Sequence, residues 1–226
     1  MRSKSACPLA SPLATLDTPS IKIPIGHTLS YFEHNEYTSE TFKGKDFYGE
    51  TISGVEFDRC SFIDCNFMQT TFDRCQFVEC EFSKCNLSVA RMEYSKFSEV
   101  TFRGCKALGV DWSKAVWPRL VFSSPINFHE SVINDSSFYG LSLQDIAIEG
   151  CTAYKVDFRN ADFSKANFTH TDFQGSIFSD TNLSHANFVH AINFNIDIFK
   201  NQIKKAKFDR FEAVRLLDSL DIELVD

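Results

Sequence analysis

The chain lacks the long apolar runs, glycine-rich loops and catalytic motifs that define several common classes of protein. It contains no run of about 18 apolar residues, so the sequence predicts no membrane-spanning helix. Neither a phosphate-binding loop nor an HExxH or GxSxG motif is present, so nothing in the sequence supports an enzyme. Glycine (9) and proline (6) are scarce among 226 residues, which excludes collagen-like and low-complexity chains.

The cysteines and histidines also lack the spacing of metal or redox sites. No two cysteines are separated by two residues, as zinc fingers and thioredoxin-like sites require. Seven of the eight occupy one slot of a five-residue repeat, where Ala, Ser, Thr and Val occur elsewhere: Cys60, Cys65, Cys75, Cys80, Cys85, Cys105 and Cys151. We interpret them as buried free thiols and expect a reducing, cytoplasmic compartment. His170 and His190 share an outward repeat position, with His185 one face away, but we interpret all three as solvated and expect no metal or cofactor.

Phenylalanine, by contrast, is abundant and regularly spaced. In the stretch FDRCSFIDCNFMQTTFDRCQFVECEFSKCNL (57–87) a large apolar residue recurs at every fifth position, and the period can be followed from Phe32 to Phe208. Of the 24 phenylalanines, all but Phe194, Phe199 and Phe211 occupy this position. A step of five fits neither a helix nor a strand. On a helix it would place the side chains all around the axis, and on a strand it would place them alternately on opposite faces.

A backbone that turns by roughly 90° at each repeat would bring every fifth side chain to one common axis. Four repeats then close a square coil, and successive coils stack at the strand spacing of ~4.8 Å. The sequence therefore predicts an all-β solenoid, a quadrilateral β-helix, over residues 31–208. Residues 1–30 contain Pro8, Pro12, Pro19 and Pro24 and are expected to form a disordered tail.

Stacked coils predict columns of inward side chains. One column is expected to contain Phe62, Phe82, Phe102, Phe122 and Phe163, and another Phe57, Phe77, Phe97, Phe138, Phe158 and Phe178. Both columns include a shift of the period by one residue near 123–127, where Pro125 favours a one-residue bulge at a corner. The period leaves almost no room for long projecting loops between Phe32 and Phe208.

The period stops after Phe208, and helical spacing replaces it. Phe211, Val214, Leu217 and Leu220 form one apolar stripe, which predicts a short C-terminal α-helix within residues 209–226. An open end coil exposes apolar side chains and unpaired backbone groups, so we expect this helix to cap the solenoid. The same four residues are candidates for the contact of a homodimer.

The net charge of −7 is unevenly distributed along the chain. Residues 120–199 contain three basic and nine acidic residues. Eight of these acids occupy outward positions, and we interpret them as a partner-binding surface: Glu130, Asp135, Asp145, Glu149, Asp157, Asp162, Asp172 and Asp180. A negative rod attracts the basic groove of a DNA-binding protein and disfavours direct binding of nucleic acid. The alternative is that the acids only keep a phenylalanine-rich rod soluble.

The repeat is most regular in NADFSKANFTHTDF and TNLSHANF, where a small residue, a polar residue and then Phe or Leu recur. This pattern resembles the pentapeptide repeat proteins, whose fold is a right-handed quadrilateral β-helix. The order of parts resembles the Qnr quinolone-resistance proteins and their mycobacterial relative MfpA. These parts are a cysteine-rich first half, the interruption KALGVDW, a second half of ADF and ANF repeats, and the closing DIFKNQIKKAKFDRFEAVRLLDSLDIELV.

This resemblance implies a non-enzymatic, cytoplasmic bacterial protein that binds DNA gyrase or topoisomerase IV. Such a protein mimics duplex DNA and protects the enzyme from quinolone-type poisons, and so confers antibiotic resistance. The resemblance also implies a homodimer joined through Phe211, Val214, Leu217 and Leu220, with the outward acids taking part in the mimicry. Two alternatives stay open: a plain scaffold or adaptor, and an immunity protein against a natural gyrase-poisoning toxin.

Overall fold

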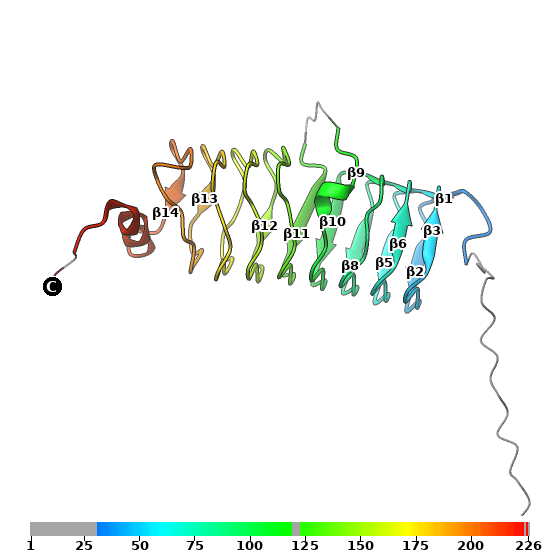
Figure 1. Ribbon diagram of the computed structural model, residues 1–226. Coiled ribbons are helices and arrows are strands. Elements are labelled where there is room, and N and C mark those ends of the chain that lie inside the picture. The colour runs from blue at the N-terminus through cyan, green and yellow to red at the C-terminus, as the bar shows by residue number, and fades with distance from the viewer. Residues whose placement is uncertain (1–30, 119–122, 224, 226) are drawn as a thin grey trace, which may run out of the picture.

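The five-residue repeats wind into a β-solenoid, of which the structure, a computed structural model, describes residues 31–118, 123–223 and 225 (Figure 1). Its elements are β1 (Glu36–Thr38), β2 (Thr41–Lys43), β3 (Thr51–Ser53), β4 (Glu56–Asp58), β5 (Ser61–Ile63), β6 (Thr71–Asp73), β7 (Gln76–Val78), β8 (Glu81–Ser83), β9 (Lys96–Ser98), β10 (Val100–Arg103), η1 (Trp112–Lys114), β11 (Ile126–His129), β12 (Ile148–Glu149), β13 (Asn187–Phe188), β14 (Lys207–Phe208) and η2 (Glu212–Leu220). The strands are short because the chain turns a corner after each repeat.

Each coil has four sides, here called faces I to IV in chain order. Face I contains β3 and β6, face II the sheet β1-β4-β7-β9, and face III the sheets β2-β5-β8-β10-β11-β12 and β13-β14. Face IV is joined by isolated bridges, such as that between Asp46 and Asn66. Pairing is parallel and in register, so that Phe62 lies opposite Phe82. This four-sided parallel winding confirms the predicted solenoid.

Side chains at the central repeat position point inward and stack from coil to coil. The rings of Phe62 and Phe82 are stacked with centroids 4.6 Å apart, and those of Phe158 and Phe178 are stacked at 4.9 Å. Rings of neighbouring columns meet edge to face, as Phe57 and Phe62 do at 77°. Stacked and edge-to-face contacts are the two arrangements that aromatic pairs prefer, so each phenylalanine supports its own column and the next one.

The slot two positions before each inward residue holds a hydrogen-bond donor wherever it contains Cys, Ser or Thr. The Cys85 thiol donates to the Phe62 carbonyl of the preceding coil at 3.3 Å, and the Thr171 hydroxyl donates to Ile148 at 2.7 Å. At these positions polarity is therefore part of the fit, in addition to small size. The seven cysteines in the repeat are buried and free, and Cys7 lies outside the described residues.

Burial makes most of these thiols unreactive; Cys105 is the exception, because a hydrogen bond with Cys85 lowers its pKa. Burial raises the pKa of Cys75 to about 11 and that of Cys80 and Cys151 to about 12. Such groups stay protonated at neutral pH, whereas the thiolate is the nucleophile and the metal ligand. Within residues 31–118 and 123–223, moreover, no three His, Cys, Asp or Glu side chains are grouped so that they could hold a metal ion.

The shift of the period between the two halves is larger than the predicted single residue. The Cys105 N–H donates to Ser131 Oγ across 26 residues, whereas the equivalent bond from Cys75 to Ser95 spans 20. The difference places six additional residues between Trp117 and the next coil. Six is one repeat plus one residue, so the phase of the period alone cannot distinguish this insertion from a slip of one.

The insertion changes the predicted columns beyond it. Phe128, and not Phe122, follows Phe102, with their rings stacked at 4.9 Å, and Phe122 lies outside the described residues. Phe138 stacks on Trp112 of face I at 6.1 Å, whereas Trp117 stacks on Phe97 of face II.

The two predicted columns are therefore wrong beyond the insertion. Phe163 does not follow Phe62, Phe82 and Phe102, and Phe138, Phe158 and Phe178 do not follow Phe57, Phe77 and Phe97. Face I carries Ile52, Phe72, Met92, Trp112, Phe138, Phe158 and Phe178; face II carries Tyr37, Phe57, Phe77, Phe97, Trp117, Leu143, Phe163 and Leu183; face III carries Phe42, Phe62, Phe82, Phe102, Phe128, Ile148, Phe168, Phe188 and Phe208; face IV carries Phe47, Phe67, Leu87, Ala107, Ile133, Ala153 and Phe173. The prediction of almost no room for a projecting loop was also wrong, because six residues beyond the repeat lie between Trp117 and β11.

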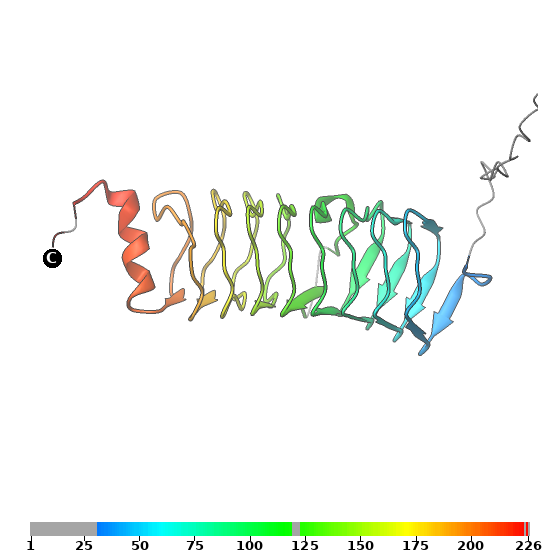
Figure 2. The same cartoon turned by 90° about the horizontal axis from the view of Figure 1, so that it is seen from below.

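Both ends of the solenoid are covered. At the amino-terminal end Tyr31 packs edge to face on Phe32 and Phe47, with ring centroids 5.3 and 5.1 Å away. At the other end η2 stands across the last coil (Figure 2), and Leu216 packs against the core. The expected α-helix is a 3₁₀ helix, preceded by one α-type bond from Ala213 N–H to the Asp209 carbonyl. Among the described residues, no helix is long and apolar enough to cross a membrane.

Candidate functional site

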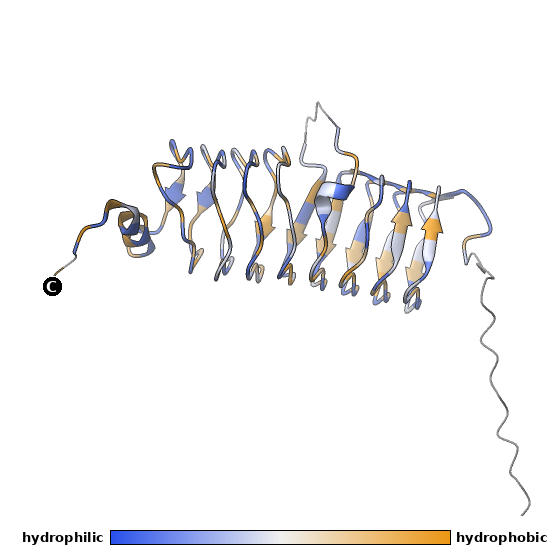
Figure 3. Ribbon diagram, viewed as in Figure 1, coloured by the Kyte–Doolittle hydropathy of each residue, from blue (hydrophilic) through white to orange (hydrophobic). Residues whose placement is uncertain are grey.

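The eight acids expected to form a partner-binding surface do not share one face. Face I carries Asp157 and Asp180, face II Asp145 and Asp162, face III Glu130 and Glu149, and face IV Asp135 and Asp172. The structure therefore distributes the acids around the rod. Hydrophilic and hydrophobic residues alternate within each coil (Figure 3), so every face offers outward positions to a charged residue.

Three of these acids hold the turn that follows them. The carboxylates of Asp157, Asp162 and Asp172 accept the backbone N–H two residues later, at 3.1, 2.9 and 3.1 Å. Asp and Asn side chains favour such turns because they reach the local backbone. These positions therefore have a structural reason to be Asp that involves no partner.

Another four acids occupy corners where the backbone is left-handed. The φ angles of Glu130, Asp135, Asp145 and Asp180 are 51°, 57°, 61° and 56°. Glycine is the residue that adopts this conformation most easily, and Asp is among the side chains that tolerate it best. The aspartates at these corners are thus also explained in part by the fold.

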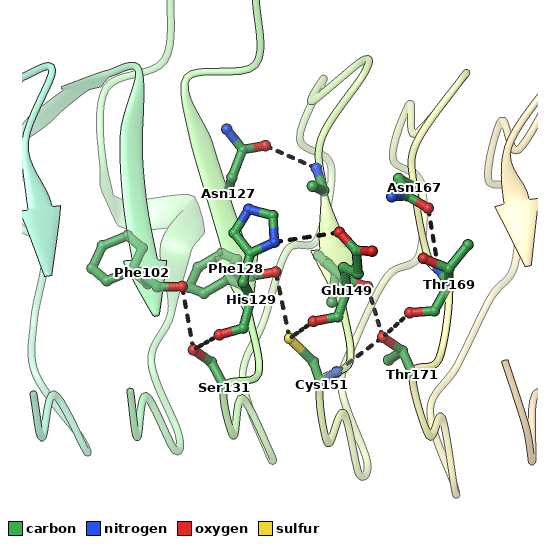
Figure 4. A network of polar contacts seen from close by, with 12 residues as sticks. Phe102, Asn127, Phe128, His129, Ser131, Glu149, Cys151, Asn167, Thr169 and Thr171 are labelled. Carbon is green, nitrogen blue, oxygen red and sulfur yellow. Dashed lines mark hydrogen bonds and ion pairs between the residues drawn. The ribbon is translucent and has the colours of Figure 1, made fainter. Parts of the chain in front are cut away.

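Some of the acids are paired with basic side chains, and others are not. Asp145 lies 3.8 Å from Lys165, and Glu149 reaches His129 on the neighbouring coil at 3.4 Å (Figure 4). The Arg159 guanidinium hydrogen-bonds to Asp157 at 2.8 Å and lowers the pKa of that carboxyl. No cationic side chain of the described residues lies within ion-pair distance of Glu130, Asp135 or Asp180. These three remain the most available negative charges of the predicted surface.

The four residues of the predicted dimer contact lie in one row of η2. A 3₁₀ helix has 3.0 residues per turn, so positions 211, 214, 217 and 220 eclipse one another. Phe211 is 87% exposed, Val214 46% and Leu220 37%, while Leu217 is half-buried. The row is an apolar strip at the end of the rod, and Ile222 (53% exposed) continues apolar surface beyond it.

Polar contacts hold η2 in place across the end of the solenoid. The Asp209 carboxylate accepts a hydrogen bond from the His190 backbone N–H and lies 3.1 Å from His190 Nδ1. Arg215 bonds to Glu212 at 2.7 Å and reaches Asn193 at 3.4 Å. The helix thus runs from face III across face IV with a fixed orientation, which also fixes where the apolar row points.

The histidines form a pair, and no third ligand among the described residues joins them. The rings of His170 and His190 lie 4.7 Å apart on face III, and the Asp209 carboxylate contacts His190 only. His185 follows Leu183 on face II. Their arrangement gives His190 the role of an anchor for the start of η2.

Sequence reasoning missed two apolar surfaces. Phe199 is 74% exposed on the last coil, and a groove lined by Trp117, Val116 and Val78 runs along face II. Phe199 falls outside the five-residue period, which was a usable signal. No signal in the sequence indicated the groove, because its position depends on where the insertion begins.

Two family models match the chain: one described as a pentapeptide repeat region over residues 55–138, and one described as pentapeptide repeats (8 copies) over residues 142–180 and 157–192. Among solved structures, a trypsin-treated variant of QnrB1, a plasmid-mediated fluoroquinolone resistance protein, matches with a TM-score of 0.66 and 20% identity, covering 84% of this chain and 99% of that chain. Full-length QnrB1 matches with a TM-score of 0.62 and 19% identity, covering 83% and 100%. No curated protein sequence matches the chain. At this identity the likeness to QnrB1 shows a common fold.

Proposed function

This chain belongs to the pentapeptide repeat proteins, and we propose that it binds a bacterial type II topoisomerase, DNA gyrase or topoisomerase IV, and protects that enzyme from quinolone-type poisons. The observation that carries the proposal is the end-to-end match with QnrB1, a fluoroquinolone resistance protein, because 84% of this chain accounts for 99% of that one. The protein would act in the cytoplasm as a binding protein without catalytic activity of its own.

The shape of the rod supports binding in place of DNA. From Phe42 to Phe208 the face III column makes eight coil-to-coil steps, or ~38 Å at ~4.8 Å per step. Two such rods joined end to end approach ~77 Å, the length of about 22 base pairs at ~3.4 Å each. A topoisomerase groove that holds a duplex of this length could accept the dimer.

Charge supports the proposal less than shape does. A net charge of −7 is far below one negative charge per ~1.7 Å of duplex axis. Three acids that neither pair with a cation nor hold a turn, Glu130, Asp135 and Asp180, are the ones that we assign to electrostatic attraction. The acids that support turns or ion pairs contribute less.

Dimerisation through η2 is the second part of the proposal. The row Phe211, Val214, Leu217 and Leu220 exposes apolar side chains at the end of the rod, and a two-fold axis through this row would bury it and extend the rod. Phe211→Asp is expected to yield monomers by light scattering, because the ring is 87% exposed and its loss leaves the core intact. Tyr94→Asp, at a 62% exposed site in the first half, is the matched control. An unchanged dimer mass for the Phe211 variant would refute this interface.

A supercoiling assay with purified gyrase, relaxed plasmid and ciprofloxacin tests the function. Adding the full chain is expected to restore supercoiling at drug concentrations that block gyrase alone. Phe211→Asp should require more protein for the same recovery, because a monomer presents only half of the rod. Absence of recovery at any protein concentration would end the proposal.

A scaffold or adaptor is the second candidate function. It is favoured by the distribution of the acids over all four faces and by their roles in turns and left-handed corners. A scaffold predicts that replacing Glu130, Asp135 and Asp180 by Gln, Asn and Asn leaves topoisomerase activity in the presence of drug unchanged. The same variant weakens protection if the chain mimics DNA.

A further inference from the structure

Face II of the first half has an apolar groove that neither the acids nor η2 explains. Its walls are two rows of outward side chains that run along the rod, Gln76, Lys96 and Val116 in one and Val78, Ser98 and Pro118 in the other. The groove has a volume of about 460 Å³ and is floored by Phe77, Phe97 and Trp117. It ends where the chain leaves the coil.

Trp117 gives the groove a rigid aromatic end. Its ring stacks on Phe97 with centroids 5.8 Å apart, and its Nε1–H donates to the Trp112 carbonyl at 3.0 Å. Trp117 is only partly buried, and Val116 beside it is 42% exposed. An aromatic side chain that is fixed and partly exposed is a good contact for apolar side chains, because little freedom is lost on binding.

The border of the groove is acidic. Glu56, Glu79 and Glu99 are exposed on the same face. Glu56 accepts a hydrogen bond from Gln76 at 3.1 Å, and Glu99 accepts one from Ser123 at 2.9 Å. In the described part of the chain no cation lies within ion-pair distance of these three, and Arg59 is near enough to Glu79 only for a longer-range attraction. Of the described lining residues only Lys96 is cationic. Such a border favours an occupant that is both apolar and positively charged.

We propose that the occupant is the chain's own segment 20–26, SIKIPIG, bound in an extended form. The segment alternates Ile21, Ile23 and Ile25 with other residues, so an extended chain would place all three side chains on one side. Residues 1–30 also carry Arg2, Lys4 and Lys22 against the single acid Asp17, a net positive charge opposite to that of the border. Apolar pattern and charge both match the groove.

The length of the linking chain allows this docking. Phe77 lies two coils beyond Tyr37, which is ~10 Å at ~4.8 Å per coil. Residues 26–30 span up to about 17 Å when extended, so segment 20–25 reaches the near end of the groove from Tyr31. From Phe77 to Trp117 the groove is ~10 Å long, and two isoleucines spaced ~7 Å apart fit into it. Pro24 does not oppose this geometry, because an extended segment on side chains needs no ladder bond from its nitrogen.

Docking would cover the apolar groove, and a partner of face II would have to displace the segment. This inference depends only on the groove, its border and the segment. It holds or fails independently of any topoisomerase binding.

Photo-crosslinking in the full chain tests the inference directly. A p-benzoylphenylalanine probe at Ser98, exposed on one wall of the groove, is expected to link to a peptide that contains residues 20–26. A mixture of ¹⁴N-labelled and ¹⁵N-labelled protein distinguishes links within one chain from links between two. The same probe at Ser53, exposed in β3 of face I, is the control and should give little of this product.

Two sets of variants test the chemistry. Ile23→Asp with Ile25→Asp should lower the Ser98 link about fivefold or more, to the level of the Ser53 control. Glu79→Lys with Glu99→Lys should lower it about threefold, with a smaller effect in about 0.5 M salt. Glu33→Lys with Glu93→Lys on face I is the matched control and should leave the yield unchanged. A Ser98 yield no higher than that of Ser53, or links only between chains, would overturn the proposal.

Discussion

The two halves of the solenoid share one core but differ in their outer backbone. Faces II and III of the first half consist of strands of three or four residues, from β1 to β10. After β11 the second half has strands of only two residues, and most coils are joined by isolated bridges such as Ser142 with Asp162. The same five-residue period is therefore compatible with continuous short strands and with isolated bridges between coils.

The outward residue before each inward side chain accounts for much of this difference. The first half has Glu56, Gln76 and Thr101 at this position, whereas the second half has Asp or Asn at Asp157, Asp162, Asn167, Asp172, Asn182 and Asn187. An Asp or Asn side chain accepts the N–H two residues on and so ends the strand early. Face IV of the first half behaves like the second half, because Asn66 and Asn86 form the same bond there.

This comparison limits what the acid-rich second half says about function. Aspartate at the position before the inward residue is interchangeable with asparagine for the backbone, so its charge is not required by the fold. The negative charge of these aspartates is therefore independent of their role in the turns. Replacing Asp by Asn should remove the charge and keep the turn. Variants that remove the charge of an acid but keep its hydrogen bond to the turn distinguish partner binding from a structural role.

The largest expected effect concerns the core, in which the two halves should not differ. Phe82→Ala and Phe158→Ala each remove a ring that is 1% and 0% exposed and should lower the free energy of unfolding by about 3–5 kcal/mol. Denaturant unfolding of both variants checks this. A cost confined to one half would show that the stacked columns are not equivalent.

A smaller effect is expected at the donor slot, where the donors are mostly thiols in the first half and mostly hydroxyls in the second. Thr171→Val keeps the shape but leaves the Ile148 carbonyl without its 2.7 Å donor, so we expect a loss of about 1–3 kcal/mol. Cys85→Ser keeps a donor and should cost less than Cys85→Val. Equal stability of all three variants in urea unfolding would mean that only the size of the slot matters.

The turn-forming acids should tolerate loss of charge but not loss of the acceptor. Asp162→Asn is expected to change the free energy of unfolding by less than about 0.5 kcal/mol, whereas Asp162→Val should cost about 1 kcal/mol because the Ser164 N–H loses its partner. Thermal unfolding monitored by circular dichroism compares the two. If Asp162→Asn lowered the free energy of unfolding as much as Asp162→Val, the negative charge itself would stabilise the fold.

The smallest effect concerns pH. The hydrogen bond from Arg159 lowers the pKa of Asp157, so the pair stabilises the fold above the unfolded pKa of ~3.9 and loses this contribution as the pH falls through the folded pKa. Arg159→Gln should therefore be slightly less stable than the native chain at pH 7, because so exposed an ion pair contributes little. The difference should vanish at the lowest pH. A difference that persisted there would assign the effect to packing.

The sequence predicted the solenoid, because a five-residue period admits few other backbones. It could not place Phe138 or Phe163 in their columns, since an insertion of six residues and a slip of one have the same phase. The distribution of the outward acids around the rod was predictable from the period, because all eight lie beyond the insertion and keep their mutual spacing. The groove at Trp117 was not predictable, because it depends on where the insertion begins.

The central claim is that the rod binds a topoisomerase in place of DNA, and a competition experiment tests it most directly. A fluorescent duplex bound to gyrase is titrated with the full chain, and the anisotropy of the duplex is followed. The account predicts that the protein displaces the duplex competitively, and that replacing Glu130, Asp135 and Asp180 by their amides weakens the displacement. A protein that leaves the duplex bound at every concentration would contradict it.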